Sequence, residues 1–118
     1  MPIIQHSLEV PYNVSEMYRL VNHIEKYSEF LPWCTESKVI SQDEDSILAS
    51  LTLTGGGLSK SFTTSNRLQK DKLIKINLIN GPFEHLEGYW SFETTPRGSK
   101  INLNLEFEFL FTKIKKLS

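Results

Sequence analysis

The feature that most constrains the fold is a segment near the end of the chain in which apolar and polar residues alternate. From Ile101 to Phe111 every second residue is a large apolar side chain, and Asn102, Asn104 and Glu106 are among the residues between them. Successive side chains of a β-strand point to opposite faces, so a strand built from this segment has one apolar face and one hydrated face. Such a strand requires neighbouring strands and a second layer over its apolar face.

The same period of two recurs through much of the chain. Alternating patterns cover residues 47–54, 58–68, 74–78 and 86–92, and turn-forming residues such as glycine, proline and asparagine separate most of them. A first strand is expected over residues 3–10, where an apolar-rich segment ends at a proline. The sequence therefore predicts one early strand and, later in the chain, about six successive antiparallel strands.

Two short helices are expected between the first strand and the others. Asn13 and Glu16 have the spacing of an N-cap and its capping-box partner, and apolar residues then recur at helical intervals to about His23. A second helical pattern follows over residues 24–31 and stops at Pro32. The predicted fold class is therefore α+β, a curved antiparallel sheet with two short N-terminal helices.

Length and composition restrict the number of domains and the kinds of partner. The 118 residues suffice for one domain, and 13 basic against 14 acidic residues give a net charge of −1. This charge balance excludes a domain that binds nucleic acid through an overall basic charge. It leaves open the binding of nucleic acid through a local basic patch. The single cysteine, Cys34, excludes an internal disulfide and a CxxC motif. With no signal-like N-terminus and no apolar run of about 18 residues, the sequence indicates a cytoplasmic protein.

No group of residues has the spacing of a catalytic or metal site. His6, His23 and His85 are scattered along the chain, although spacing alone leaves open a site assembled in space. The glycines at 55–57 lack the lysine and hydroxyl residue of a phosphate-binding loop, and the acidic residues 43–45 are typical of a solvated turn. We therefore expect no enzyme, no catalytic residue, no bound metal and no resident cofactor.

Five short segments, in order along the chain, resemble a known family. They are the sequences VPY, FLP, FTT, GPF and FEF at residues 10–12, 30–32, 62–64, 81–83 and 107–109. Together they resemble the coenzyme Q-binding START-domain family, also called the polyketide cyclase and lipid-transport-like family. The resemblance implies a helix-grip fold of the START and Bet v 1 type, in which a curved antiparallel sheet wraps a long C-terminal helix and encloses an apolar tunnel.

The resemblance also implies a function without catalysis, the binding of ubiquinone or a related isoprenoid lipid in support of respiration. Thr64 and Asn66 share the parity of Phe62, so they are expected to point inward and to hydrogen-bond a quinone carbonyl, while Trp33 and Phe83 guard the opening. Without a ligand, the same apolar side chains would form an ordinary core. The rest of the expected lining is Leu31, Leu53, Leu78, Trp90, Phe92, Leu105 and Phe107.

Bacterial members of the family imply a second function, binding to the large ribosomal subunit so that subunit joining is blocked. Lysines at 70, 72 and 75 and a second group within 113–116 offer contacts to rRNA phosphates. Lysines at turns and sheet edges also serve solubility. A third function, polyketide cyclisation, rests on the family name alone, because a shared fold does not carry chemistry.

The family's long C-terminal helix is expected to begin near Lys113 and to continue past Ser118, where the given sequence stops. We therefore expect residues 1–118 to form a single START-like domain that is C-terminally truncated relative to the family. An uncovered apolar sheet face leads us to expect self-association through that face and transient contact with a membrane surface, at the periphery of the inner membrane.

Overall fold

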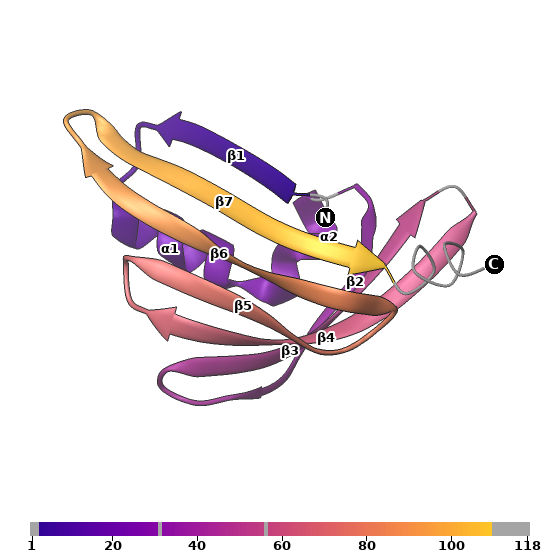
Figure 1. The fold of residues 1–118 in the computed structure, drawn as a ribbon. Helices are drawn as coiled ribbons and strands as arrows, with labels where there is room; N and C mark the ends of the chain where they lie inside the picture. The colour runs from indigo at the N-terminus through magenta and orange to yellow at the C-terminus, as the bar shows by residue number, and fades with distance from the viewer. Residues whose placement is uncertain (1–2, 31, 56, 110–118) are drawn as a thin grey trace.

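The protein is described by a computed structural model that covers residues 3–30, 32–55 and 57–109. One strand is followed by two short helices with a 3-10 turn between them, and then by six strands (Figure 1). The elements are β1 (Ile3–Val10), α1 (Val14–Asn22), the 3-10 turn η1 (Ile24–Lys26), α2 (Tyr27–Phe30), β2 (Cys34–Gln42), β3 (Ser46–Gly55), β4 (Leu58–Gln69), β5 (Leu73–Asn80), β6 (Phe83–Thr95) and β7 (Gly98–Phe109).

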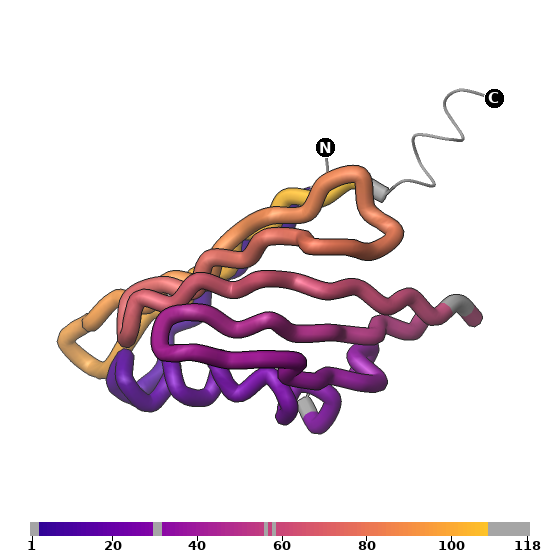
Figure 2. Tube along the Cα trace, turned by 90° about the horizontal axis from the view of Figure 1, so that it is seen from below, coloured from indigo at the N-terminus to yellow at the C-terminus, as the bar shows by residue number. Residues whose placement is uncertain are grey.

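All seven strands belong to one antiparallel sheet in the order β1-β7-β6-β5-β4-β3-β2. From β2 to β7 the order follows the chain, and Figure 2 shows β2, β3 and β4 running side by side. β1 pairs with β7, so the first and last strands of the sequence are neighbours. The α+β class and the curved antiparallel sheet expected from the sequence are confirmed. The long helix expected to begin near Lys113 lies outside the described residues.

The helices cover one face of the sheet, which we call the inner face (Figure 1). α1 packs against β6 and β7, while η1 and α2 pack against β2. The predicted cap of α1 is present, since the backbone N–H of Glu16 donates to Asn13 Oδ1 at 2.8 Å. The second predicted helix is divided into η1 and α2, and Leu31 lies outside the described residues.

The core beneath α1 is built from the apolar stripe of the helix and the inner faces of three strands. Tyr18 and Val21 of α1 pack on Ile74, Phe92 and Ile101. The rings of Tyr18 and Phe92 meet edge to face with centroids 5.6 Å apart, a favourable geometry for two aromatic rings. α1 therefore covers this part of the inner face.

The pairing of β6 with β7 leaves no room for a side chain at Gly88. Gly88 pairs with Leu105, and a Cβ atom placed on Gly88 would lie 2.1 Å from the carbonyl oxygen of Asn104. That distance is far inside van der Waals contact with backbone, so no side chain fits without separating the strands. Glycine interrupts strands where another backbone approaches this closely.

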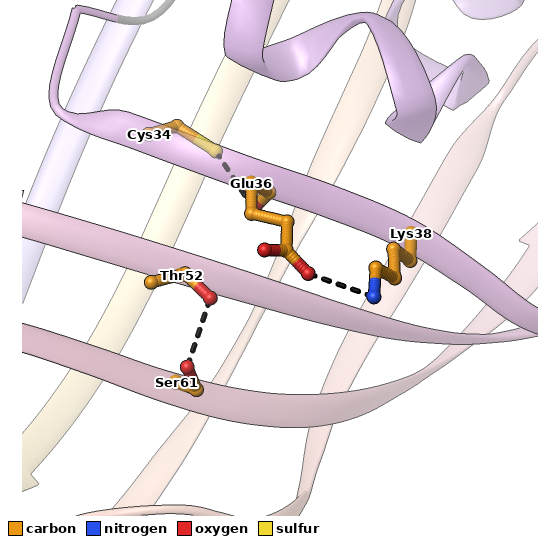
Figure 3. A network of polar contacts seen from close by, with 5 residues as sticks. All are labelled: Cys34, Glu36, Lys38, Thr52 and Ser61. Atoms are coloured by element: carbon orange, nitrogen blue, oxygen red, sulfur yellow. Dashed lines mark hydrogen bonds and ion pairs between the residues drawn. The ribbon is translucent and has the colours of Figure 1, made fainter.

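The outer face of the sheet carries the polar residues of the predicted alternating pattern. Thr52 on β3 and Ser61 on β4 are joined by a hydroxyl hydrogen bond of 2.8 Å (Figure 3). On β2, Lys38 Nζ lies 2.9 Å from Glu36 Oε1 in the same view. Among the described residues, no helix combines the length and apolar composition required to cross a membrane.

The contact at Gly88 leads to a first prediction. Gly88→Ala should lower the free energy of unfolding by about 1–3 kcal/mol, because the added methyl group must push β6 away from β7. Gly55→Ala is the matched control, since a Cβ there meets nothing within 4 Å, and its stability should stay within about 0.5 kcal/mol of the parent. Urea unfolding of both variants measures the difference, and equal stability of the two would contradict the proposed role of Gly88.

Candidate functional site

A cavity of about 150 Å³ lies between the inner face of the sheet and the segment that joins η1 to β2. Six strands, β2 to β7, contribute to its walls, and the helical segment contributes Ile24 and Tyr27. The remaining lining residues are Trp33, Cys34, Ala49, Leu51, Leu53, Phe62, Thr64, Asn66, Ile76, Leu86, Trp90, Leu103 and Leu105. The cavity is therefore apolar with a few polar side chains, the usual composition of a small-molecule site.

Three larger hollows, of about 490, 470 and 510 Å³, lie elsewhere on the described surface. They are lined largely by polar and charged side chains, such as Lys75, Glu87 and Glu106 on the outer face of β5, β6 and β7. Such hollows remove little apolar surface from water. The inner cavity is thus the better candidate for an apolar ligand, despite its smaller volume.

Two buried polar side chains of β4 face this cavity. Thr64 is 2% exposed and Asn66 is 7% exposed. Asn66 stands in a row between Ile47 of β3 and Ile76 of β5, so its cross-strand neighbours offer it only apolar side chains. Its Oδ1 is buried and has no hydrogen-bond partner within the described parts of the chain. A buried polar atom without a partner is destabilising and calls for an explanation.

Cys34 reaches the cavity because of a β-bulge at the start of β2. The register shifts between Cys34 and Glu36, which places Cys34 toward the inner face and Glu36 on the outer face (Figure 3). The Cys34 thiol donates to the carbonyl oxygen of Glu36 at 3.5 Å. Burial raises the pKa of this thiol above its ordinary value, so it is neutral near pH 7.

Tyr27 is the other ionisable side chain of the cavity wall. Its hydroxyl donates to the backbone carbonyl of Val21, which fixes the ring against the end of α1. Burial is the main cause that raises the pKa of Tyr27 far above its usual range, and the nearby Cys34 raises it further. Neither Tyr27 nor Cys34 is therefore charged at neutral pH.

Trp33 marks the opening of the cavity. It lines the cavity and is also 51% exposed, whereas its neighbour Cys34 is 2% exposed. The backbone carbonyl of Trp33 accepts a hydrogen bond of 2.8 Å from the N–H of Thr54, which fixes the residue beside the end of β3. The cavity thus opens toward this end of β3.

The structure brings together part of the ligand-binding set expected from the sequence. The expected residues that line the cavity are Trp33, Leu53, Phe62, Thr64, Asn66, Trp90 and Leu105. Leu78 and Phe107 are half-buried and pack beside the cavity in a cluster around Phe62 and Phe83. Leu31 lies outside the described residues.

Two of the expected residues, Phe83 and Phe92, are not among the residues that line the cavity. Phe83 is not at the opening: it is 8% exposed and packs edge to face on Phe62, with ring centroids 5.3 Å apart. Phe92 faces inward as its parity predicts, but it lies in the core under α1, where Tyr18 covers it. Both residues belong to packed aromatic contacts beside or beyond the cavity.

Several residues of the cavity wall are not among those expected from the sequence. Those in strands share the inward parity already recognised, and these are Ala49, Leu51, Ile76, Leu86 and Leu103. For Ile24 and Tyr27 the sequence pattern indicates a helix but not the cavity, and Cys34 has no sequence signal because a bulge, and not strand parity, sets its direction.

A separate group of possible metal ligands lies on the outer face. Ligand atoms of His85, Glu87 and Glu106 lie within 4.8 Å of one another, with His85 Nε2 3.5 Å from Glu87 Oε1. A register shift between Phe83 and His85 places His85 on the same face as Glu87, which stands directly opposite Glu106. Like charges directly opposite one another in this way repel. The group does not reach the cavity.

Residues 10–118 match the family model described as polyketide cyclase / dehydrase and lipid transport. The chain belongs to this family. The ribosome association toxin RatA of Pseudomonas aeruginosa is 41% identical over 113 residues, covering 95% of this chain and 78% of that protein. RatA of Escherichia coli K12 is 38% identical, covering 92% and 70%. The mitochondrial coenzyme Q-binding protein COQ10 of Dictyostelium discoideum is more distant, at 27% identity over 86% of this chain and 52% of that protein.

Two solved structures share the fold of this chain. The protein TTHA0849 of Thermus thermophilus superposes with a TM-score of 0.87 at 18% identity, covering 98% of this chain and 83% of that one. The aromatase/cyclase ZhuI of Streptomyces sp. R1128 superposes with a TM-score of 0.83 at 14% identity, covering 92% and 68%. At these identities the likeness concerns the fold alone.

The unpartnered amide in the cavity leads to a second prediction. Asn66→Leu should raise the free energy of unfolding of the ligand-free protein by about 1–3 kcal/mol, because it removes a buried polar atom without a partner. Asn102→Leu is the control, since the Asn102 side chain bonds Ser7, Ser91 and Glu93, and its loss should be destabilising. Urea unfolding checks both, and destabilisation by Asn66→Leu would show that the amide has partners in the folded protein.

Proposed function

We propose that the chain binds a small lipophilic molecule in the inner cavity and that an isoprenoid quinone such as ubiquinone is the leading ligand class. The observation that carries this proposal is an apolar cavity in which two buried polar side chains, Thr64 and Asn66, are placed side by side on β4. The name of the COQ10 relative and the lipid transport activity in the family description support the same class.

The lining favours an apolar ligand on energetic grounds. Transfer of apolar surface from water is worth about 25 cal/mol per Å², and the cavity wall consists almost wholly of aliphatic and aromatic side chains. Sites for such ligands use a small number of polar groups to fix orientation. Thr64 and Asn66 are suited to that role because both are buried at the inner face.

The same wall favours binding over catalysis. Its ionisable side chains among the described residues are Tyr27 and Cys34, and both are neutral near pH 7. General acid–base and nucleophilic catalysis rely on groups whose pKa lies near the working pH or on an activated nucleophile. We therefore propose a carrier or sensor of the ligand, not an enzyme that converts it.

A third prediction tests ligand binding directly. The purified protein, extracted with organic solvent and analysed by mass spectrometry, should release a lipophilic molecule, and Ala49→Leu should reduce its amount because the larger side chain occupies cavity space. Phe92→Leu is the control: it loosens the core beneath α1 but lies outside the cavity, so the bound amount should stay unchanged in protein that remains folded. Empty protein that also fails to take up added quinone would contradict the proposal.

Ribosome association is a second candidate function, favoured by the names of the RatA relatives at 38–41% identity. We propose the large ribosomal subunit as the partner. Lys70, Lys72 and Lys75 are exposed around the β4–β5 connection, and within the described residues no carboxylate oxygen lies within 4.0 Å of their amines. Unpaired lysines of this kind can contact phosphates. The lysines in 113–116 lie outside the described residues.

A fourth prediction addresses this candidate. Added protein should sediment with large ribosomal subunits and lower the ratio of joined to free subunits, and replacing Lys70, Lys72 and Lys75 together by Gln should weaken co-sedimentation, because phosphate contacts are lost. The matched control replaces Lys26 and Lys38, which already pair with Glu29 and Glu36. No change in the subunit ratio with the parent protein would remove this function.

A further inference from the structure

We propose that the ligand group that meets Asn66 is a neutral hydroxyl carried on a single ring, so that a phenol or hydroquinone binds in preference to the corresponding carbonyl compound. This inference rests on the proposed ligand-binding function and names the chemical form of the ligand. It differs from the expectation drawn from the sequence, in which Thr64 and Asn66 meet a quinone carbonyl.

The buried amide oxygen of Asn66 lacks a hydrogen-bond partner among the described residues. The side chain lines the cavity, is 7% exposed, and has a buried Oδ1 that accepts no hydrogen bond from the described residues. Among the other polar side chains of the wall, the Tyr27 hydroxyl donates to the Val21 carbonyl and the Cys34 thiol to the Glu36 carbonyl. Thr64 lies two residues away on β4 but does not donate to Asn66 Oδ1. The occupant of the cavity is therefore the natural source of a donor.

A hydroxyl group and a carbonyl group on the ligand differ in the hydrogen bonds that they can form with Asn66. The Oδ1 atom needs a donor, and a ligand carbonyl has none to give. If the amide turns over, its NH₂ group faces the ligand and needs an acceptor instead. A hydroxyl satisfies either orientation because it both donates and accepts, whereas a carbonyl serves only one. The hydroxyl is thus the group that Asn66 accommodates best.

The size of the cavity and the lack of charged residues in its described wall restrict the ligand further. The cavity holds about 150 Å³, and apolar cavities of about 150 Å³ in other proteins bind benzene. One ring fits, while a fused polycyclic ligand exceeds this space. Among the described lining residues none is Lys, Arg, His, Asp or Glu, so an ionised phenolate, carboxylate or phosphate has no counter-charge here. An apolar tail leaves past Trp33, where the cavity opens.

Isothermal titration with two matched ligand pairs tests the inference. The first pair is 4-propylphenol and its methyl ether, 4-propylanisole, which keeps the oxygen but cannot donate. The second is a short-chain isoprenoid benzohydroquinone and its quinone, compared without oxygen. The parent protein should bind the hydroxyl member of each pair roughly tenfold more tightly, the effect of one buried group left unpaired.

Two variants assign the preference to one residue. In Asn66→Leu the ratio of affinities within each pair should fall to about one, because the leucine offers no hydrogen bond. Asn77→Leu is the matched control on the adjacent strand β5: Asn77 pairs with Ser65 and Glu87 and lies outside the cavity, so the preference should persist.

The outcomes separate this inference from the proposed function. Equal or tighter binding of the anisole and the quinone by the parent protein would overturn the hydroxyl preference while leaving ligand binding intact. A hydroxyl preference that survives in Asn66→Leu would overturn the role of Asn66. Failure of all four compounds to bind would overturn the proposed function itself, and the inference with it.

Discussion

The pairing of β6 with β7 depends on a glycine at position 88, because a side chain there would collide with the β7 backbone. Side chains of β3 and β4 line one cavity together with those of β6 and β7, although β5 lies between the two pairs in the sheet, so the sheet is curved here. A flat sheet would spread Ala49 and Leu105 over a surface open to water. Because Gly88 has no side chain, the backbones of β6 and β7 approach closely beside Leu105, a residue of the cavity wall.

Much of the fold was predictable from the sequence because strand parity is a local property. Alternation placed Phe62, Thr64 and Asn66 on the inner face, and the capping residue Asn13 was found from spacing alone. Parity does not tell which half of the face a helix covers, so Phe92 was expected in the tunnel although Tyr18 packs on it. β1, the first strand of the chain, pairs with β7, the last strand, and no residue pattern within either strand indicates this pairing.

Bulges explain the remaining differences. One extra residue in a strand reverses the direction of every side chain before it, and no residue pattern in this chain marks where that happens. The bulge before Glu36 turns Cys34 inward, and the one before His85 leaves Phe83 inside the aromatic cluster. The two candidate functions use different parts of the same strands: β4 and β5 carry Asn66 and Ile76 within the cavity, and the lysines stand around their connection.

The placement of tryptophan has a practical consequence. The chain contains two tryptophans, and both line the cavity, Trp33 at the opening and Trp90 within. Indole emission responds to the polarity and the aromatic neighbours of its surroundings, and here no tryptophan elsewhere contributes a background signal. The intrinsic fluorescence of this protein is therefore suited to showing, without a label, whether an added molecule enters the cavity.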